Sequence, residues 1–125
     1  MEKIKLHFLS IAIMTVMVIL AGCSVEPLES KRLNASVSFI SGTQFLITNN
    51  DSYAWNYVDL RINHEYTLKV GRIDAGSSYT VDTFQFADSS GQRFNIFKTK
   101  LQSLYISNAI NQYSAVDGDK IFHFK

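Results

Sequence analysis

The sequence predicts an all-β domain: an antiparallel β-sandwich or a small barrel of seven or eight strands. Between residues 35 and 125, short runs alternate apolar and polar residues with a period of two, which is typical of half-buried strands. Clusters of Gly, Asn, Asp and Ser separate these runs at intervals of about 8 to 12 residues, as turns do in sandwiches. Aromatic residues are plentiful after residue 23 and can supply the core.

Residues 1–22 precede this domain and have the layout of a cleaved signal peptide. Lys3 and Lys5 form a basic start, and a dominantly apolar stretch runs from Phe8 to Ala21. Fourteen helical residues rise about 21 Å, which is short of the roughly 30 Å hydrocarbon core, so a permanent spanning helix is the weaker interpretation. We therefore expect a signal helix that is removed on export.

The end of this segment, Leu20-Ala21-Gly22-Cys23, resembles the lipobox of bacterial lipoproteins. The resemblance implies cleavage between Gly22 and Cys23, a diacylglycerol thioether on the Cys23 thiol and a further acyl chain, such as palmitate, on the freed amine. Two or three acyl chains hold a protein far more firmly than one. The alternatives are an ordinary secretory signal followed by a free cysteine, or a simple membrane anchor.

Residues 23–34 are polar, mixed in charge and without periodicity, and we interpret them as the lipidated N-terminus and a flexible tether. By resemblance to Gram-negative lipoproteins, in which Asp after the cysteine signals retention in the inner membrane, Ser24 favours the outer membrane. In an organism with one membrane, the expected location is the outer face of the plasma membrane. The folded domain is expected to begin at residue 35.

The alternation of apolar residues places each strand in turn. The expected strands are 35–40, 44–48, 55–63, 66–70, 79–87, 93–97, 104–107 and 121–124. Residues 98–112 fit either a helical turn through Leu101 and Leu104 or the strand 104–107 followed by a loop. Asp117-Gly118-Asp119 is expected to be a hairpin turn.

The strand at 55–63 has two different faces. Val58, Leu60 and Ile62 fall on one side and Trp55, Tyr57, Asp59 and Arg61 on the other, so the second set should be the more solvated. Tyr53, Trp55 and Tyr57 are therefore candidates for contacting a protein, peptide or glycan partner. The simpler alternative, which we favour, is that Trp55 packs into the core or caps its end.

The chain resembles the immunoglobulin-like domains of small bacterial lipoproteins through the succession Phe45-Leu46-Ile47-Thr48-Asn49-Asn50, Trp55 to Asn63, Gly76-Ser77-Ser78, Phe86-Ala87-Asp88 and Gly91-Gln92-Arg93-Phe94. The resemblance covers about residues 35–97. It implies an immunoglobulin-like β-sandwich and no particular chemistry.

Charge and cysteine content exclude several classes of function. Removing Lys3, Lys5 and Glu2 from totals of 12 basic and 11 acidic residues leaves ten of each, and nucleic-acid binding needs a basic excess. Contact with the bilayer should accordingly come from lipid on Cys23, since no polybasic segment is present. Cys23 is the one cysteine, so no disulfide can form within the chain.

No catalytic or metal-binding pattern emerges. His64 and His123 follow the signal segment, but neither has a second ligand at metal-binding spacing, and no Gly-x-Ser-x-Gly motif occurs. Aspartates in predicted turns are explained by turn chemistry. We expect no cofactor and no metal.

Three functions remain. The first is a non-catalytic envelope lipoprotein that serves as an interaction or accessory module for another envelope protein. The second is a small-ligand or glycan binder, which requires a concave pocket lined by Tyr57, Trp55 or their neighbours. The third and weakest is a hydrolase, which requires His64 or His123 beside a nucleophile or carboxylate in a cleft.

Overall fold

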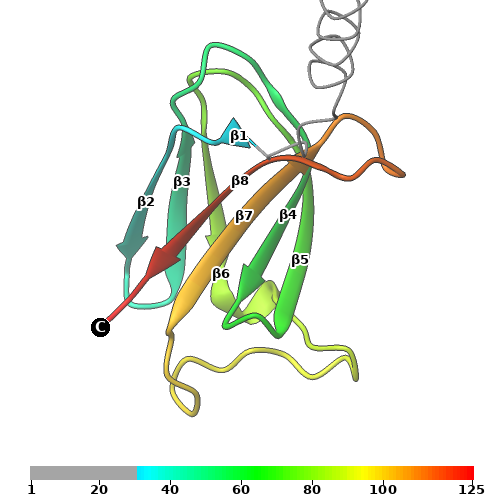
Figure 1. The fold of residues 1–125 in the computed structure, drawn as a ribbon. Helices are drawn as coiled ribbons and strands as arrows, with labels where there is room; N and C mark the ends of the chain where they lie inside the picture. Colours follow the sequence, from blue (N-terminus) through cyan, green and yellow to red (C-terminus); the bar gives the residue numbers. More distant parts are fainter. Residues whose placement is uncertain (1–30) are drawn as a thin grey trace, which may run out of the picture.

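The computed structural model describes residues 31–125, and these form two β-sheets that face each other (Figure 1). The predicted signal peptide, the Leu20–Cys23 motif and Ser24 lie outside the described residues. The strands are Lys31–Arg32 (β1), Ala35–Ile40 (β2), Gln44–Asn49 (β3), Trp55–Ile62 (β4), Tyr66–Ile73 (β5), Ser78–Asp82 (β6), Ser103–Ala109 (β7) and Val116–His123 (β8). The predicted all-β sandwich is confirmed.

The order of strands in each sheet defines the topology. One sheet has the order β1-β8-β7-β4-β5 and the other the order β2-β3-β6. The pairs are antiparallel except for β1 with β8, which are parallel. This order corresponds to that of immunoglobulin-type sandwiches, with β2, β3 and β6 as strands A, B and E, and β8, β7, β4 and β5 as strands G, F, C and C′.

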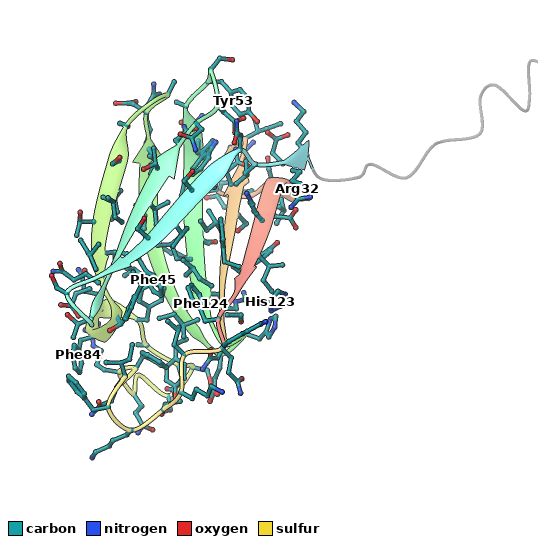
Figure 2. All side chains as sticks on the ribbon, turned by 90° about the vertical axis from the view of Figure 1, so that its left-hand side faces the viewer. Arg32, Phe45, Tyr53, Phe84, His123 and Phe124 are labelled. Atoms are coloured by element: carbon teal, nitrogen blue, oxygen red, sulfur yellow. The ribbon has the colours of Figure 1, made fainter. Side chains whose placement is uncertain are left out.

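The core lies between the two sheets. Phe45 of β3 is fully buried there, with ring centroids 6.3 Å from Phe86 and 5.9 Å from Phe124; Figure 2 shows Phe45 and Phe124 toward the same end of the sandwich. Leu60 and Ile106, from the facing sheet, are fully buried. Each such side chain contributes about 1.5–3 kcal/mol by leaving water.

The first strand of the described residues, β1, begins at Lys31, within the segment interpreted above as a tether. Lys31 pairs with Gly118 and Arg32 with Asp119, and the next residue, Leu33, is buried. A side chain at Gly118 would place its Cβ 2.7 Å from a Leu33 methyl group, so glycine permits the close approach of β1 to β8. Nothing in the sequence of residues 31–34 predicts this, because the partner strand lies at the other end of the chain.

Two predictions about the last third of the chain are wrong. Residues 117–119 are not a turn but lie inside β8. Gly118 has no side chain, and this leaves the space that the Leu33 side chain occupies. The connection between β7 and β8 is instead the loop of residues 110–115. The alternative of a strand at 104–107 is confirmed, since these residues lie within β7, and the helical turn through Leu101 is wrong.

The segment from β6 to β7 is more irregular than expected. The strand predicted at 79–87 ends at Asp82, whose side chain accepts from the backbone N–H of Phe84 (2.9 Å) and caps a single 3-10 turn, Thr83–Gln85 (η1). The strand predicted at 93–97 is reduced to one bridge between Ala87 and Arg93. Asn95 then accepts from the Phe97 N–H, which favours a turn over a strand.

No helix among residues 31–125 is long and apolar enough to cross a membrane.

Candidate functional site

An irregularity in β4 determines which side chains face outward. The pairing with β5 shifts between Trp55 and Val58, so β4 carries a β-bulge. Tyr57 lies in this bulge with a positive φ of 48°, and Gly71, opposite Val58, has a φ of 93°. Left-handed backbone is uncommon for a bulky residue such as tyrosine, whereas glycine adopts it readily.

The bulge corrects the predicted division of this strand into two faces. Trp55 was expected beside Tyr57 on the solvated side, but the extra residue turns Trp55 to the core side, where it is 0% exposed. Its indole N–H donates to Asp51 (2.9 Å), which also accepts from the Asn34 backbone N–H (3.2 Å). The alternative of a packed tryptophan is confirmed, so Trp55 is not part of an exposed surface.

The three aromatic candidates are therefore separated. Trp55 is in the core, while Tyr53 lies exposed in the loop between β3 and β4, at the end of the sandwich that carries Arg32 (Figure 2). Burial of part of its ring and the nearby Asp51 carboxylate raise the pKa of the Tyr53 phenol. Only Tyr57, 47% exposed, lies on the sheet itself.

Tyr57 borders a hollowed surface on the outside of the five-stranded sheet. We call this surface the Tyr57 face. It is formed by outward side chains of β4, β5 and β7, namely Tyr57, Asp59, Arg61, Thr67, Lys69, Tyr105 and Ser107. Two adjoining hollows of about 170 and 370 Å³ share Asp59, Lys69, Ser107 and Val116 in their linings. Asn111, Gln112 and Ser114 of the β7–β8 loop complete the smaller one.

Charges of both signs alternate across this face. Asp59 stands opposite Lys69 in the pairing of β4 with β5, and Arg61 stands opposite Tyr105 in the pairing of β4 with β7. The Tyr105 hydroxyl donates to Asp119 (3.0 Å). Partial burial and this hydrogen bond raise the pKa of Tyr105, so its phenol stays protonated at neutral pH. The face is thus a mixed polar and aromatic surface.

The two histidines that the structure describes lie away from the Tyr57 face. His64 lies in the turn between β4 and β5, and His123 at the end of β8 opposite Ser103, and both are exposed. Neither lines either hollow of the Tyr57 face. Among residues 31–125, no three His, Cys, Asp or Glu side chains lie close enough to hold a metal ion.

Sequence reasoning missed most of the Tyr57 face. Asp59 and Arg61 were placed correctly on the solvated side of β4, but their neighbours in the sheet were not foreseen. Lys69 alternates with Leu68 and Val70 along β5, and this alternation marks it as outward-facing. The contribution of Ser107 and Asn111 depends on which strand lies beside β4, and a single sequence carries no signal for that.

No protein-family model, curated protein or solved structure matches the chain in the comparisons with known proteins.

Proposed function

We propose that the chain is a lipid-anchored lipoprotein of the bacterial cell envelope that acts by binding a protein partner on the Tyr57 face, without catalysis. Support for the anchor comes from the resemblance of Leu20-Ala21-Gly22-Cys23 to a lipobox. Cys23 would carry the diacylglycerol and palmitate groups, and Ser24 favours the outer membrane where there are two membranes. The partner would be another envelope protein.

The observation that carries the binding proposal is the backbone of Tyr57. A bulky residue in left-handed conformation costs about 1–3 kcal/mol, and such strain is concentrated at functional sites. Gly would fit the bulge without that cost and Asn with less of it, yet a tyrosine stands there, half exposed, on the edge of the hollow. Bulges also serve to re-aim a side chain beside a binding surface.

The rest of the face suits a protein more than a small molecule. The smaller hollow, of about 170 Å³, is below the roughly 300–1,000 Å³ of pockets for drug-sized ligands, and the larger, of about 370 Å³, is at the lower end of that range. Both are lined mainly by polar and charged side chains on the outside of a sheet, whereas ligand pockets are mostly apolar. Tyrosine and arginine dominate the energetics of protein interfaces. The alternating charges of Asp59, Arg61 and Lys69 would give the partner a fixed register through electrostatic complementarity.

The binding proposal can be tested with a photo-crosslinking amino acid in cells that make the full chain. We expect Lys69, in the middle of the Tyr57 face, to give one defined protein adduct. Thr80, equally outward-facing on β6 of the other sheet, is the matched control and should give none. The Lys69 adduct should disappear with Tyr57→Ser, and adducts of the same mass from both positions would contradict the proposal.

The anchor is tested separately by Cys23→Ala. This substitution removes the thiol to which lipid would attach, so the chain should move from the membrane to the soluble fraction. Mass spectrometry of the unmodified protein should find acyl groups on Cys23. Unchanged fractionation together with a Cys23 free of lipid would contradict the anchor and leave the Tyr57 face untouched.

Glycan binding is a second candidate, favoured by the smaller hollow. Tyr57 lies there beside the side chains of Asn111, Gln112 and Ser114, and an aromatic ring with neighbouring amides suits a sugar. Titration of isotope-labelled protein with soluble cell-wall oligosaccharides should then shift the backbone amide signals of Tyr57 and Asn111. Saturable shifts confined to these residues would favour this candidate over a protein partner.

A further inference from the structure

The loop between β7 and β8, residues 110–115, carries the most exposed apolar side chains at its end of the molecule. Tyr113 is 88% exposed and Ile110 is 70% exposed, and Val116 at the start of β8 is 44% exposed. Most other large apolar side chains of the described residues are at least partly buried. Isolated exposed apolar residues are ordinary at protein surfaces, so what distinguishes this loop is where it lies relative to the start of the described chain.

The loop lies beside the point at which the described chain begins. β1 runs parallel to β8, with Lys31 opposite Gly118, two residues after Val116. Two strand residues cover about 7 Å, so the loop and Lys31 are at the same end of the sandwich. Figure 1 shows β1 and the β7–β8 loop in the upper half of the view and the C-terminus in the lower half.

The length of chain between Lys31 and Cys23 limits how far this end can stand from a lipid anchor. The eight peptide steps from Cys23 to Lys31 cover at most about 29 Å when fully extended. If Cys23 is lipidated, the loop is therefore held close to the bilayer at a high effective concentration. A weak intrinsic affinity for lipid is then enough to keep the loop at the surface.

From these observations we infer that the β7–β8 loop is a membrane-contacting loop whose Ile110 and Tyr113 side chains rest among the lipid headgroups next to the anchor. The inference rests on the proposed lipidation of Cys23. Tyrosine suits this position because its ring is apolar and its hydroxyl stays hydrated, and tyrosines are enriched at membrane interfaces. The occupant is a phospholipid surface.

The contact is apolar and does not depend on anionic lipid. Lys31 and Arg32 are exposed at this end, but Asp117 adjoins the loop and Asp51 lies near Asn34, so the local charges nearly balance. We therefore expect the loop to contact neutral phosphatidylcholine, with little response to salt.

The contact also orients the domain. With Ile110 and Tyr113 at the surface, the strands of the sandwich point away from the bilayer, and the opposite end, with Phe84 and Phe97, faces the aqueous compartment. The Tyr57 face then stands to the side of the anchor, where a partner in the same membrane or beyond it can reach it.

The test uses tryptophan reporters in the full chain, purified from membranes with its lipid and reconstituted in phosphatidylcholine vesicles. Tyr113→Trp places the reporter in the loop. Phe97→Trp is the matched control, since Phe97 is 78% exposed and its loop precedes β7, whereas residues 110–115 follow it. Trp55 is present in both variants and is buried, so it contributes the same background.

We expect brominated phosphatidylcholine to quench Tyr113→Trp but not Phe97→Trp, and acrylamide to quench Tyr113→Trp about threefold less, as for a tryptophan in the headgroup region. Adding Ile110→Ser should weaken the lipid quenching. If Cys23 carries lipid and the two reporters are quenched equally by acrylamide, the inference is wrong and the anchor stands. If the mass of the purified protein shows no lipid on Cys23, the anchor and the inference fail together.

Discussion

The two ends of the sandwich use the same local chemistry in different surroundings. At the end that carries β1, Asn49 donates to the carbonyls of Tyr53 (3.0 Å) and Ile73 (3.1 Å) and is fully buried. At the opposite end, Asn63 donates to the Lys100 carbonyl (2.8 Å) and accepts from the Gln102 N–H (2.7 Å) near the surface. Both ends thus depend on Asn side chains that satisfy backbone groups.

The difference between the ends is burial, and burial decides what each hydrogen bond is worth. An unpaired polar group in the core cannot turn to water, whereas one at the surface can. At the β1 end, the buried Trp55 also donates a hydrogen bond to Asp51 of the β3–β4 loop. A substitution of Trp55 therefore removes core packing and a hydrogen bond together. We therefore expect substitutions at the β1 end to cost more stability than matched ones at the other end.

The largest effect is expected for Trp55→Ala. It leaves a cavity in the core and removes the indole N–H that donates to Asp51, so the free energy of unfolding should fall by about 3–5 kcal/mol. Trp55→Phe keeps most of the packing and should cost less. Urea denaturation followed by circular dichroism measures both, and the exposed Tyr53→Ala is the control. A cost for Trp55→Ala no greater than that for Tyr53→Ala would show that this end is not held by burial.

Asn63→Ala tests the opposite end and should cost about 1–2 kcal/mol, since water can replace part of the lost bonding. Asn63 also has a positive φ of 52°, so part of this cost is backbone strain in alanine. Asn63→Gly removes the same hydrogen bonds without the strain, and the difference between the two variants in urea denaturation isolates it. Equal costs for Trp55→Ala and Asn63→Ala would remove the distinction between the ends.

Tyr57→Asn should raise the stability of the fold, whereas the two previous substitutions lower it. Asparagine tolerates the left-handed backbone of the β4 bulge better than tyrosine, so the midpoint of urea denaturation should rise by the equivalent of about 0.5–1 kcal/mol. The same variant should lose the crosslinked partner, which would show stability exchanged for binding. A variant less stable than the original protein would mean that Tyr57 is held by packing and not under strain.

The smallest effect is expected for Asp88→Asn, in the exposed loop beyond η1. The Ser90 side chain, then the Gln92 backbone N–H, donate to the Asp88 carboxylate and lower its pKa. Because the folded-state pKa is depressed, this stabilisation is fully present above the ordinary Asp pKa and is lost as the pH falls through the folded-state value.

Urea denaturation at pH 7 and at about pH 3 tests whether the stabilisation by the Asp88 carboxylate is lost as the pH falls. The difference in stability between Asp88→Asn and the original protein should be small at pH 7, since the amide oxygen still accepts hydrogen bonds, and should shrink further at the lower pH. Asn95→Ala, in the same irregular segment, lacks a titrating group and should show the same difference at both pH values. A difference for Asp88→Asn that grows as the pH falls would contradict the assignment.

Local patterns predicted most of the strands, and the failures at residues 117–119 and at Tyr57 trace to contacts between distant segments. Residues 35–40 and 44–48 alternate strictly and form β2 and most of β3 as expected. Asp117-Gly118-Asp119 has the composition of a turn but lies within β8, because Leu33 needs the space above Gly118. The bulge at Tyr57 likewise has no local signature, since its other half, Gly71, lies on the neighbouring strand.

For the site, the sequence by itself determined which residues of β4 are polar and that basic and acidic residues balance after residue 22. It also determined that Cys23 stands in a lipobox-like motif. Only the tertiary structure decided that Trp55 turns inward while Tyr57 stays out, that Lys69 and Ser107 join it on one face, and that the β7–β8 loop lies beside Lys31. The physical reason is that alternation and turn propensity act over a few neighbouring residues. Strand order and register are set by burial between segments far apart in the chain.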